Sequence, residues 1–202
     1  MFRLPNAITI TRILLVPVFA VAFVLPGDTA RIVAFAIFCI AGLSDALDGL
    51  AARKLNAGSN FGRMLDPIAD KILVAVALMM LVAEGNISQF NLDPSLKGLL
   101  RLVPALVILA REILVSGLRE FLGAARVSIP VVAMAKFKTT IQMIAIGAMI
   151  LEPLATRDLA GPLVIPYQTI AYGLLWAAAG LTVATGYVYF RSGLRHLQGI
   201  RG

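Results

Sequence analysis

The stretch Ser44–Lys71, SDALDGLAARKLNAGSNFGRMLDPIADK, decides the fold because it places four aspartates at the facing ends of two apolar runs. Asp45 and Asp48 are three residues apart, and Asp66 and Asp70 are four residues apart, so each pair lies on one face of a helix. The Asn, Gly and Ser residues in the middle of the stretch are typical of a turn. Folding back at this turn brings all four carboxylates to one level of a helical hairpin.

The composition indicates that this hairpin lies in a membrane. Of the 202 residues, 59% are hydrophobic, and the mean hydropathy is +0.89, whereas a soluble domain contains about 45–50% apolar residues. A spanning helix needs about 20 residues, so the chain has room for six. The apolar runs are residues 10–26, 31–52, 64–83, 98–118, 131–151 and 168–190. We predict an all-α integral membrane protein with six transmembrane helices, formed by residues 1–202 as a single domain.

Clusters of Gly, Pro, Asn and Asp between the apolar runs predict the connecting loops. The predicted loops are PGDTA (26–30), NAGSN (56–60), GNISQFNLDPS (85–95), GAARVSIP (123–130) and PLATRDLAGPLVIP (153–166). Pro17 interrupts the first run, but the run is long enough for an uncleaved spanning helix rather than a signal peptide.

The basic residues predict the orientation. If the spans alternate from an internal N-terminus, the cytoplasmic side receives Arg3, Arg12, Arg53, Lys54, Arg63, Lys71, Arg111, Arg119, Arg126, Lys136, Lys138, Arg191, Arg195 and Arg201. The opposite side receives only Arg31, Lys97, Arg101 and Arg157. This bias satisfies the positive-inside rule, so both termini are predicted to be cytoplasmic. The net charge of +7 then reflects topology and anionic headgroups, and it is no evidence for nucleic-acid binding.

Four carboxylates that converge in a membrane hairpin need compensating charge, because one Asp within a span costs about 2.5–3.5 kcal/mol. Salt bridges to Arg53, Arg63 or Lys71 are one source, although both arginines lie at helix ends where they reach water. Two divalent cations, Mg²⁺ or Mn²⁺, are the better partners, because Asp oxygens suit hard ions and four carboxylates hold two ions about 3.5–4 Å apart. A two-ion site indicates an anionic substrate with a phosphoryl centre.

Two glycines of the hairpin fit a bulky ligand. Gly49 follows Asp48, and Gly62 opens the third predicted helix, so side chains are missing where a ligand could approach the backbone. The alternative is close helix packing by small residues, which is common in membranes.

These residues resemble the signature of the CDP-alcohol phosphatidyltransferase family. The matching positions are Asp45, Asp48, Gly49, Ala52, Arg53, Gly62, Asp66 and Asp70. The resemblance implies a six-helix membrane enzyme, usually a homodimer, that moves a phosphatidyl group from a CDP-linked lipid to an alcohol and releases CMP.

The resemblance also implies a role for each position. The four aspartates would hold two divalent metal ions, and Asp70 would be the general base. The nucleotide would be contacted by Gly49, Ala52, Arg53 and Gly62. Thr9, near the start of the first helix, is a further candidate for a nucleotide contact, and helix capping is the alternative for it.

A second group of cations lies near the predicted cytoplasmic side, in REILVSGLRE (111–120) and AKFKTTIQ (135–142). The candidates for binding the phosphate of an acceptor are Arg111, Arg119, Lys136 and Lys138. Arg111 and Arg119 are eight residues apart and therefore on similar faces of a helix, and Arg and Lys donors suit phosphate oxygens. The alternatives are ion pairs with Glu112 and Glu120, or the headgroups of anionic lipids.

Both of these stretches, together with LPNAITITRILLVP (4–17), resemble the glycerophosphate-using branch of the family, the phosphatidylglycerophosphate synthases. This implies CDP-diacylglycerol and sn-glycerol 3-phosphate as substrates, and an active site at the cytoplasmic face of the cell (inner) membrane. Other acceptors stay open: phosphatidylglycerol, which would give cardiolipin, or inositol phosphate. A metal- or proton-coupled transporter is the alternative of a different class, since it would also place aspartates among its helices.

Overall fold

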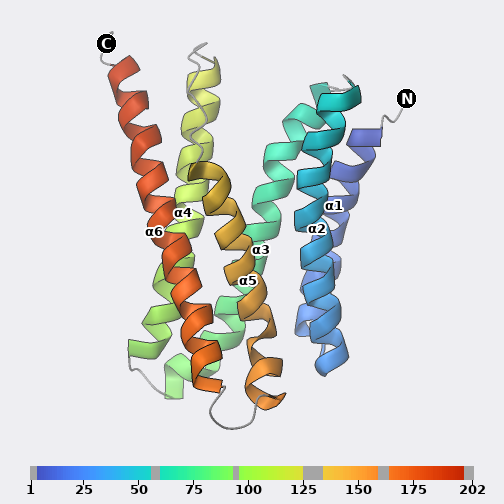
Figure 1. The fold of residues 1–202 in the computed structure, drawn as a ribbon, viewed down its shortest axis with the longest axis vertical. Helices are drawn as coiled ribbons and strands as arrows, with labels where there is room; N and C mark the ends of the chain where they lie inside the picture. The colour runs from blue at the N-terminus through green and yellow to red at the C-terminus, as the bar shows by residue number, and fades with distance from the viewer. Residues whose placement is uncertain (1–3, 56–59, 93–95, 125–133, 159–163, 198–202) are drawn as a thin grey trace. The chain divides into compact units, whose positions relative to one another are not determined.

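The structure, a computed structural model, describes the backbone of residues 4–55, 60–92, 96–124, 134–158 and 164–197. Within these ranges it describes the side chains of residues 9–44, 65, 68–69, 71–84, 102–123, 137–155 and 167–194. The described residues form the helices α1 (Leu4–Val24), α2 (Asp28–Leu55), α3 (Asn60–Leu92), α4 (Leu96–Ala124), α5 (Met134–Asp158) and α6 (Val164–Leu197) (Figure 1). The prediction of six helices is confirmed.

Several helices extend beyond the apolar runs that predicted them. Helix α3 continues to Leu92, so residues 85–92 of a predicted loop are helical, and α5 continues through Pro153 to Asp158. The loop predictions are wrong there because Gly, Pro, Asn and Asp favour a loop but do not always end a helix. The backbone hydrogen bonds of both helices continue through these residues. Helix α1 likewise passes through Pro17, although proline removes one backbone donor.

A tight turn of residues 25–27 joins α1 to α2. The amide of Leu25 donates to the carbonyl of Val21 at 3.1 Å, and the amide of Arg31 donates to the carbonyl of Gly27 at 3.3 Å. Gly27 has a φ of 102°, a conformation that is unstrained only for glycine. The connection therefore ends at Gly27 and not at residue 30 as predicted, because Asp28 already belongs to α2.

The chain forms two compact units. The first contains residues 1–84 and 146–168, and the second contains residues 85–145 and 169–202. The core of the first unit holds α1 against α2, where the ring of Phe19 lies 6.1 Å from the ring of Phe38. Gly147 of α5 belongs to the same unit, and a Cβ at this position would lie 3.1 Å from the ring of Phe35. Helix α5 therefore packs closely on α2.

In the second unit, α4 and α6 pack in parallel through two glycines. A Cβ at Gly186 would lie 3.1 Å from Cγ of Arg111, and a Cβ at Gly193 would lie 3.2 Å from Leu118 and from Leu122. The two glycines are seven residues apart, as are Arg111 and Leu118. Small residues of this kind let the backbones of membrane helices approach one another.

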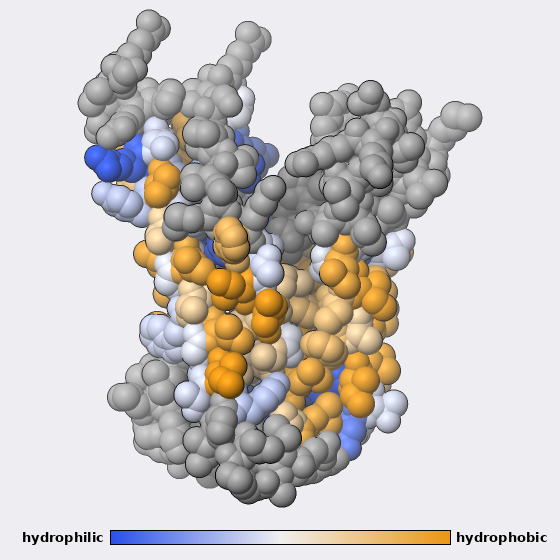
Figure 2. Space-filling view, in the orientation of Figure 1, coloured by the Kyte–Doolittle hydropathy of each residue, from blue (hydrophilic) through white to orange (hydrophobic). Residues whose placement is uncertain are grey.

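The outer surface of the described helices carries many large apolar side chains. Leu14 and Leu114, for example, are 62% and 72% exposed, and Figure 2 shows apolar side chains over much of the visible face of the described residues. One helical segment among the described residues, Tyr167–Leu194, is long and apolar enough to cross a membrane, and Thr9–Val24 is a shorter apolar segment.

Candidate functional site

The four aspartates of the signature lie on two unbroken helices of the first unit. Helix α2 is continuous through Asp45 and Asp48, and α3 is continuous through Asp66 and Asp70. Each pair therefore shares one face of its helix, as predicted. Only residues 56–59 separate the two helices, so the ends of the helices lie within about 17 Å of each other. The side chains of the four aspartates lie outside the described residues.

The donor set of the hairpin fits hard divalent cations. Carboxylate oxygens are the ligands that Mg²⁺ and Mn²⁺ prefer, and each helix of the hairpin carries two aspartates. Among the side chains that the structure describes, no group of three or more His, Cys, Asp or Glu residues is placed to hold a metal. The side chains at the predicted nucleotide positions of the hairpin lie outside the described residues as well: these positions are Gly49, Ala52, Arg53 and Gly62.

A buried arginine of α1 reaches the beginning of the signature. Arg12 is only 1% exposed, and its Nε donates a hydrogen bond to Oγ of Ser44 at 3.1 Å. Ser44 in turn donates to the carbonyl of Ala41 at 2.7 Å and directly precedes Asp45. This contact is not predicted by the sequence pattern, in which Arg12 is only one of the cytoplasmic charges. The available signal was the position of a cation at the start of an apolar run, where burying a charge is costly unless it is compensated.

Thr9 lies one turn before Arg12 on the same face of α1, and its side chain is buried. Helix α1 already includes Leu4, so Thr9 lies inside the helix. The capping alternative is therefore wrong for Thr9. Its contact with a nucleotide stays a prediction.

In the second unit, Glu112 joins two of the four predicted acceptor-binding cations. Nη1 of Arg111 donates to Oε1 of Glu112 at 3.3 Å, and Nζ of Lys138 forms an ion pair with the same oxygen. All three side chains are at least 85% buried. The predicted alternative of ion pairing with Glu112 is therefore confirmed for these two cations. Two positive charges still share one carboxylate, which leaves the cluster with a net charge of +1.

The other two cations are placed differently. Arg119 is exposed, and it lies about 12 Å further along α4 than Arg111, at 1.5 Å per residue. The Arg111 side chain is buried, so the two arginines do not share one environment although their spacing places them on similar faces of the helix. The side chain of Lys136 lies outside the described residues. Of the four predicted acceptor-binding cations, the described side chains thus place only Arg111 and Lys138 together.

A further contact to Arg111 comes from α6. Nη2 of Arg111 donates to Oγ1 of Thr185 at 2.9 Å. Sequence analysis missed Thr185, because a threonine within an apolar run gives no signal of its own.

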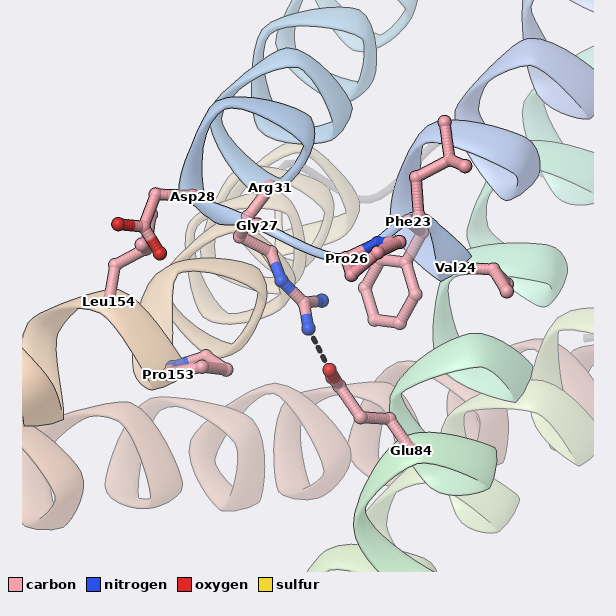
Figure 3. Close-up of a pocket in the computed structure, with 10 residues that line it drawn as sticks. Phe23, Val24, Pro26, Gly27, Asp28, Arg31, Glu84, Pro153 and Leu154 are labelled. Atoms are coloured by element: carbon pink, nitrogen blue, oxygen red, sulfur yellow. Dashed lines mark ion pairs between the residues drawn. The ribbon is translucent and has the colours of Figure 1, made fainter.

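A cavity of about 290 Å³ opens at the turn between α1 and α2, within the first unit. Its lining consists of residues 23–28, Arg31, Glu84, Pro153 and Leu154 (Figure 3). Arg31 forms an ion pair with Glu84, and its guanidinium lies 4.1 Å from the centroid of the Phe23 ring. Arg31 precedes Asp45 by about 21 Å along the continuous helix α2. This cavity is therefore separate from the acidic hairpin.

Comparisons with known proteins agree with the signature. The sequence profile described as CDP-alcohol phosphatidyltransferase matches residues 2–184. Three relatives carry the name CDP-diacylglycerol–glycerol-3-phosphate 3-phosphatidyltransferase. The relative from Rickettsia felis is 41% identical over 94% of this chain and 94% of its own. The relative from Pseudomonas fluorescens is 37% identical over 97% of this chain and 92% of its own. The relative from Bacillus subtilis is 36% identical over 94% of this chain and 94% of its own. The chain belongs to the CDP-alcohol phosphatidyltransferase family.

Proposed function

We propose that the protein transfers the phosphatidyl group of CDP-diacylglycerol to sn-glycerol 3-phosphate, giving phosphatidylglycerophosphate and CMP. The observation that carries this proposal is the alignment with the Rickettsia felis relative, which is named for this reaction and matches along 94% of both chains. The signature on α2 and α3 supports the phosphatidyl transfer. The cluster of Arg111, Glu112 and Lys138, with its net charge of +1, supports an acceptor that carries a phosphate.

We further propose that all six helices span the cell (inner) membrane, with both termini and the active site on the cytoplasmic side. The shortest helix has 21 residues, which is about 30 Å at 1.5 Å per residue and matches the hydrocarbon thickness of a bilayer. The profile match over residues 2–184 supports one functional domain that includes both compact units. The family resemblance supports a homodimer embedded in membrane lipid.

In the proposed reaction, the four aspartates of the hairpin would hold two Mg²⁺ or Mn²⁺ ions. When bound, the ions would supply positive charge that neutralises the diphosphate of the CDP-lipid. Asp70 accepts the proton of a hydroxyl of glycerol 3-phosphate, and the oxygen of this hydroxyl forms a new bond to the lipid-side phosphorus. The bond from this phosphorus to the bridging oxygen breaks, and CMP leaves with that oxygen.

The remaining predicted residues orient the two substrates. Gly49, Ala52, Arg53 and Gly62 contact the nucleotide from the hairpin, and Thr9 contacts it from α1. Arg111 and Lys138 bind the phosphate of the acceptor, helped by Arg119 and Lys136. Contacts of this kind limit the freedom of each bound substrate, which favours attack of the acceptor oxygen on the phosphorus.

An acceptor panel tests the proposal. The purified protein in detergent receives CDP-diacylglycerol, Mg²⁺ or Mn²⁺, and one acceptor at a time: glycerol 3-phosphate, phosphatidylglycerol or inositol phosphate. We expect CMP release with glycerol 3-phosphate and none after removal of the divalent ion by a chelator. CMP release with only one of the other acceptors would support phosphatidyl transfer but would refute glycerol 3-phosphate as the acceptor. A lack of CMP release with every acceptor would leave the transporter alternative.

A further inference from the structure

Helix α6 holds the Arg111 side chain at two adjacent positions. Thr185 accepts a hydrogen bond from Nη2 of Arg111 at 2.9 Å, and Gly186 faces the aliphatic stem of the same side chain. Both residues of α6 are buried. All three residues belong to the second compact unit.

The backbone of α6 fixes the direction of the Thr185 hydroxyl. Its Oγ1 lies 2.8 Å from the carbonyl oxygen of Leu181, one turn earlier, and 3.1 Å from that of Thr182. The hydroxyl has one proton, which it donates to these carbonyls. Its lone pairs therefore face Arg111 and hold Nη2 in one place.

The absence of a side chain at Gly186 leaves space for the aliphatic part of the Arg111 side chain. A Cβ at this position would lie 3.1 Å from Cγ, 3.4 Å from Nε and 3.8 Å from Cδ of Arg111. Gly173 and Gly180 of the same helix differ, because a Cβ at either position would meet nothing within 4 Å. The missing side chain at position 186 therefore matters for the place of Arg111.

We propose that Thr185 and Gly186 are positioning residues that fix the guanidinium of Arg111 for the phosphate of the acceptor. This inference rests on the proposed function. A guanidinium has five N–H donors in one plane, and the contacts to Glu112 and Thr185 each use one of them. These contacts fix the plane, so the donors that remain on Nη1 and Nη2 keep a set direction. A cation held in place in this way loses less freedom when it binds a ligand.

Valine in place of Thr185 tests the hydrogen bond, because it has a similar shape and no hydroxyl. We expect Thr185→Val to raise the KM for glycerol 3-phosphate by about tenfold, as for the loss of a hydrogen bond to a charged group, with the KM for CDP-diacylglycerol unchanged. Thr185→Ser keeps the hydroxyl and should restore the wild-type KM. Thr182→Val is the matched control on the same helix, because Oγ1 of Thr182 is buried and has no hydrogen-bond partner among the described residues.

Alanine in place of Gly186 tests the second contact. We expect Gly186→Ala to raise the KM for glycerol 3-phosphate as well, because the new Cβ displaces the stem of Arg111. Gly180→Ala adds the same methyl group to the same helix in open space and should leave both KM values unchanged. Thermal unfolding of each variant in detergent shows whether it is folded.

The outcomes separate this inference from the proposed function. A wild-type protein that releases no CMP with glycerol 3-phosphate would overturn the proposed function and this inference with it. An active wild type whose Thr185→Val variant keeps the KM of the Thr182→Val control would overturn the inference alone. Equal increases in the KM for both substrates would overturn it too, since they indicate a general distortion of the bundle.

Discussion

Nε of Arg12 on α1 donates a hydrogen bond to Oγ of Ser44 on α2 at 3.1 Å, and Ser44 is the residue before Asp45. The hydroxyl of Ser44 donates its own hydrogen bond to the carbonyl of Ala41, so α1 is tied to α2 at the residue that precedes the signature. Arg12 is also buried. Its guanidinium therefore lies beside the residue that precedes the signature.

Ser44→Ala is expected to lower the free energy of unfolding by about 1–3 kcal/mol, because a buried charged donor loses an acceptor. CMP release should also fall, since the register of α1 and α2 next to Asp45 is less well fixed. Thermal unfolding in detergent and the CMP assay measure the two effects. Ser116→Ala, the same change at a partly buried serine of α4, is the control. A Ser44→Ala variant as stable as this control would show that the hydrogen bond contributes little.

Asp70→Asn is expected to abolish CMP release, because an amide cannot accept the proton of the attacking hydroxyl. The variant should stay folded, with an unfolding temperature near that of the wild type. Asp28→Asn is a matched control, because Asp28 lies in the first turn of α2, about 26 Å along the helix from Asp45. Near-normal turnover by Asp70→Asn would remove Asp70 as the base, and loss of turnover by Asp28→Asn would show that the assay reports general damage.

Much of the fold could be predicted because it depends on local patterns. The apolar runs predicted six helices, and the spacing of Asp45 with Asp48 and of Asp66 with Asp70 predicted one-face pairs on α2 and α3. The ends of the helices could not be predicted in the same way. Residues 85–92 contain a glycine and two asparagines, which favour a loop, yet they continue α3, because such residues do not by themselves end the backbone hydrogen bonding of a helix.

Candidates for the site could be named from the sequence where residues carry charge or belong to a signature. The pairing of Arg111 and Lys138 with Glu112 depends on two different helices, and sequence analysis could offer it only as an alternative to phosphate binding. Thr185 and Gly186 gave no signal, because small and weakly polar residues are common in membrane helices for packing alone. Their relation to Arg111 becomes visible only when α4 and α6 lie side by side.

Lys138→Gln is expected to raise the KM for glycerol 3-phosphate more than Arg119→Ala does. Lys138 is buried beside Glu112, where a charge acts with little screening, whereas the exposed Arg119 is screened by water and salt. Steady-state kinetics at about 0.01 M and 0.15 M salt, where the Debye lengths are about 30 Å and 8 Å, measure both effects. The contribution of Arg119 should shrink at the higher salt concentration, and that of Lys138 should persist. A larger effect of Arg119→Ala at both concentrations would place the acceptor phosphate away from Glu112.

Arg31 and Glu84 are expected to affect stability and not catalysis. Their ion pair ties α2 to α3 at the turn that follows α1, and Arg31 also lies over the ring of Phe23. The Glu84 side chain is 40% exposed, so solvent screening limits the effect of Glu84→Gln to at most about 1 kcal/mol in the free energy of unfolding.

Arg31→Ala should lower the free energy of unfolding further, because it also removes the contact with the Phe23 ring, which contributes about 0.5–1 kcal/mol or more when desolvated. Turnover per folded molecule should equal that of the wild type in both variants, since Arg31 lies about 21 Å along α2 from Asp45. Thermal unfolding in detergent and CMP release on the same samples measure both quantities, with Arg191→Ala as an exposed arginine control. If Glu84→Gln lost CMP release while its unfolding temperature stayed unchanged, the cavity at this turn would have to take part in the reaction.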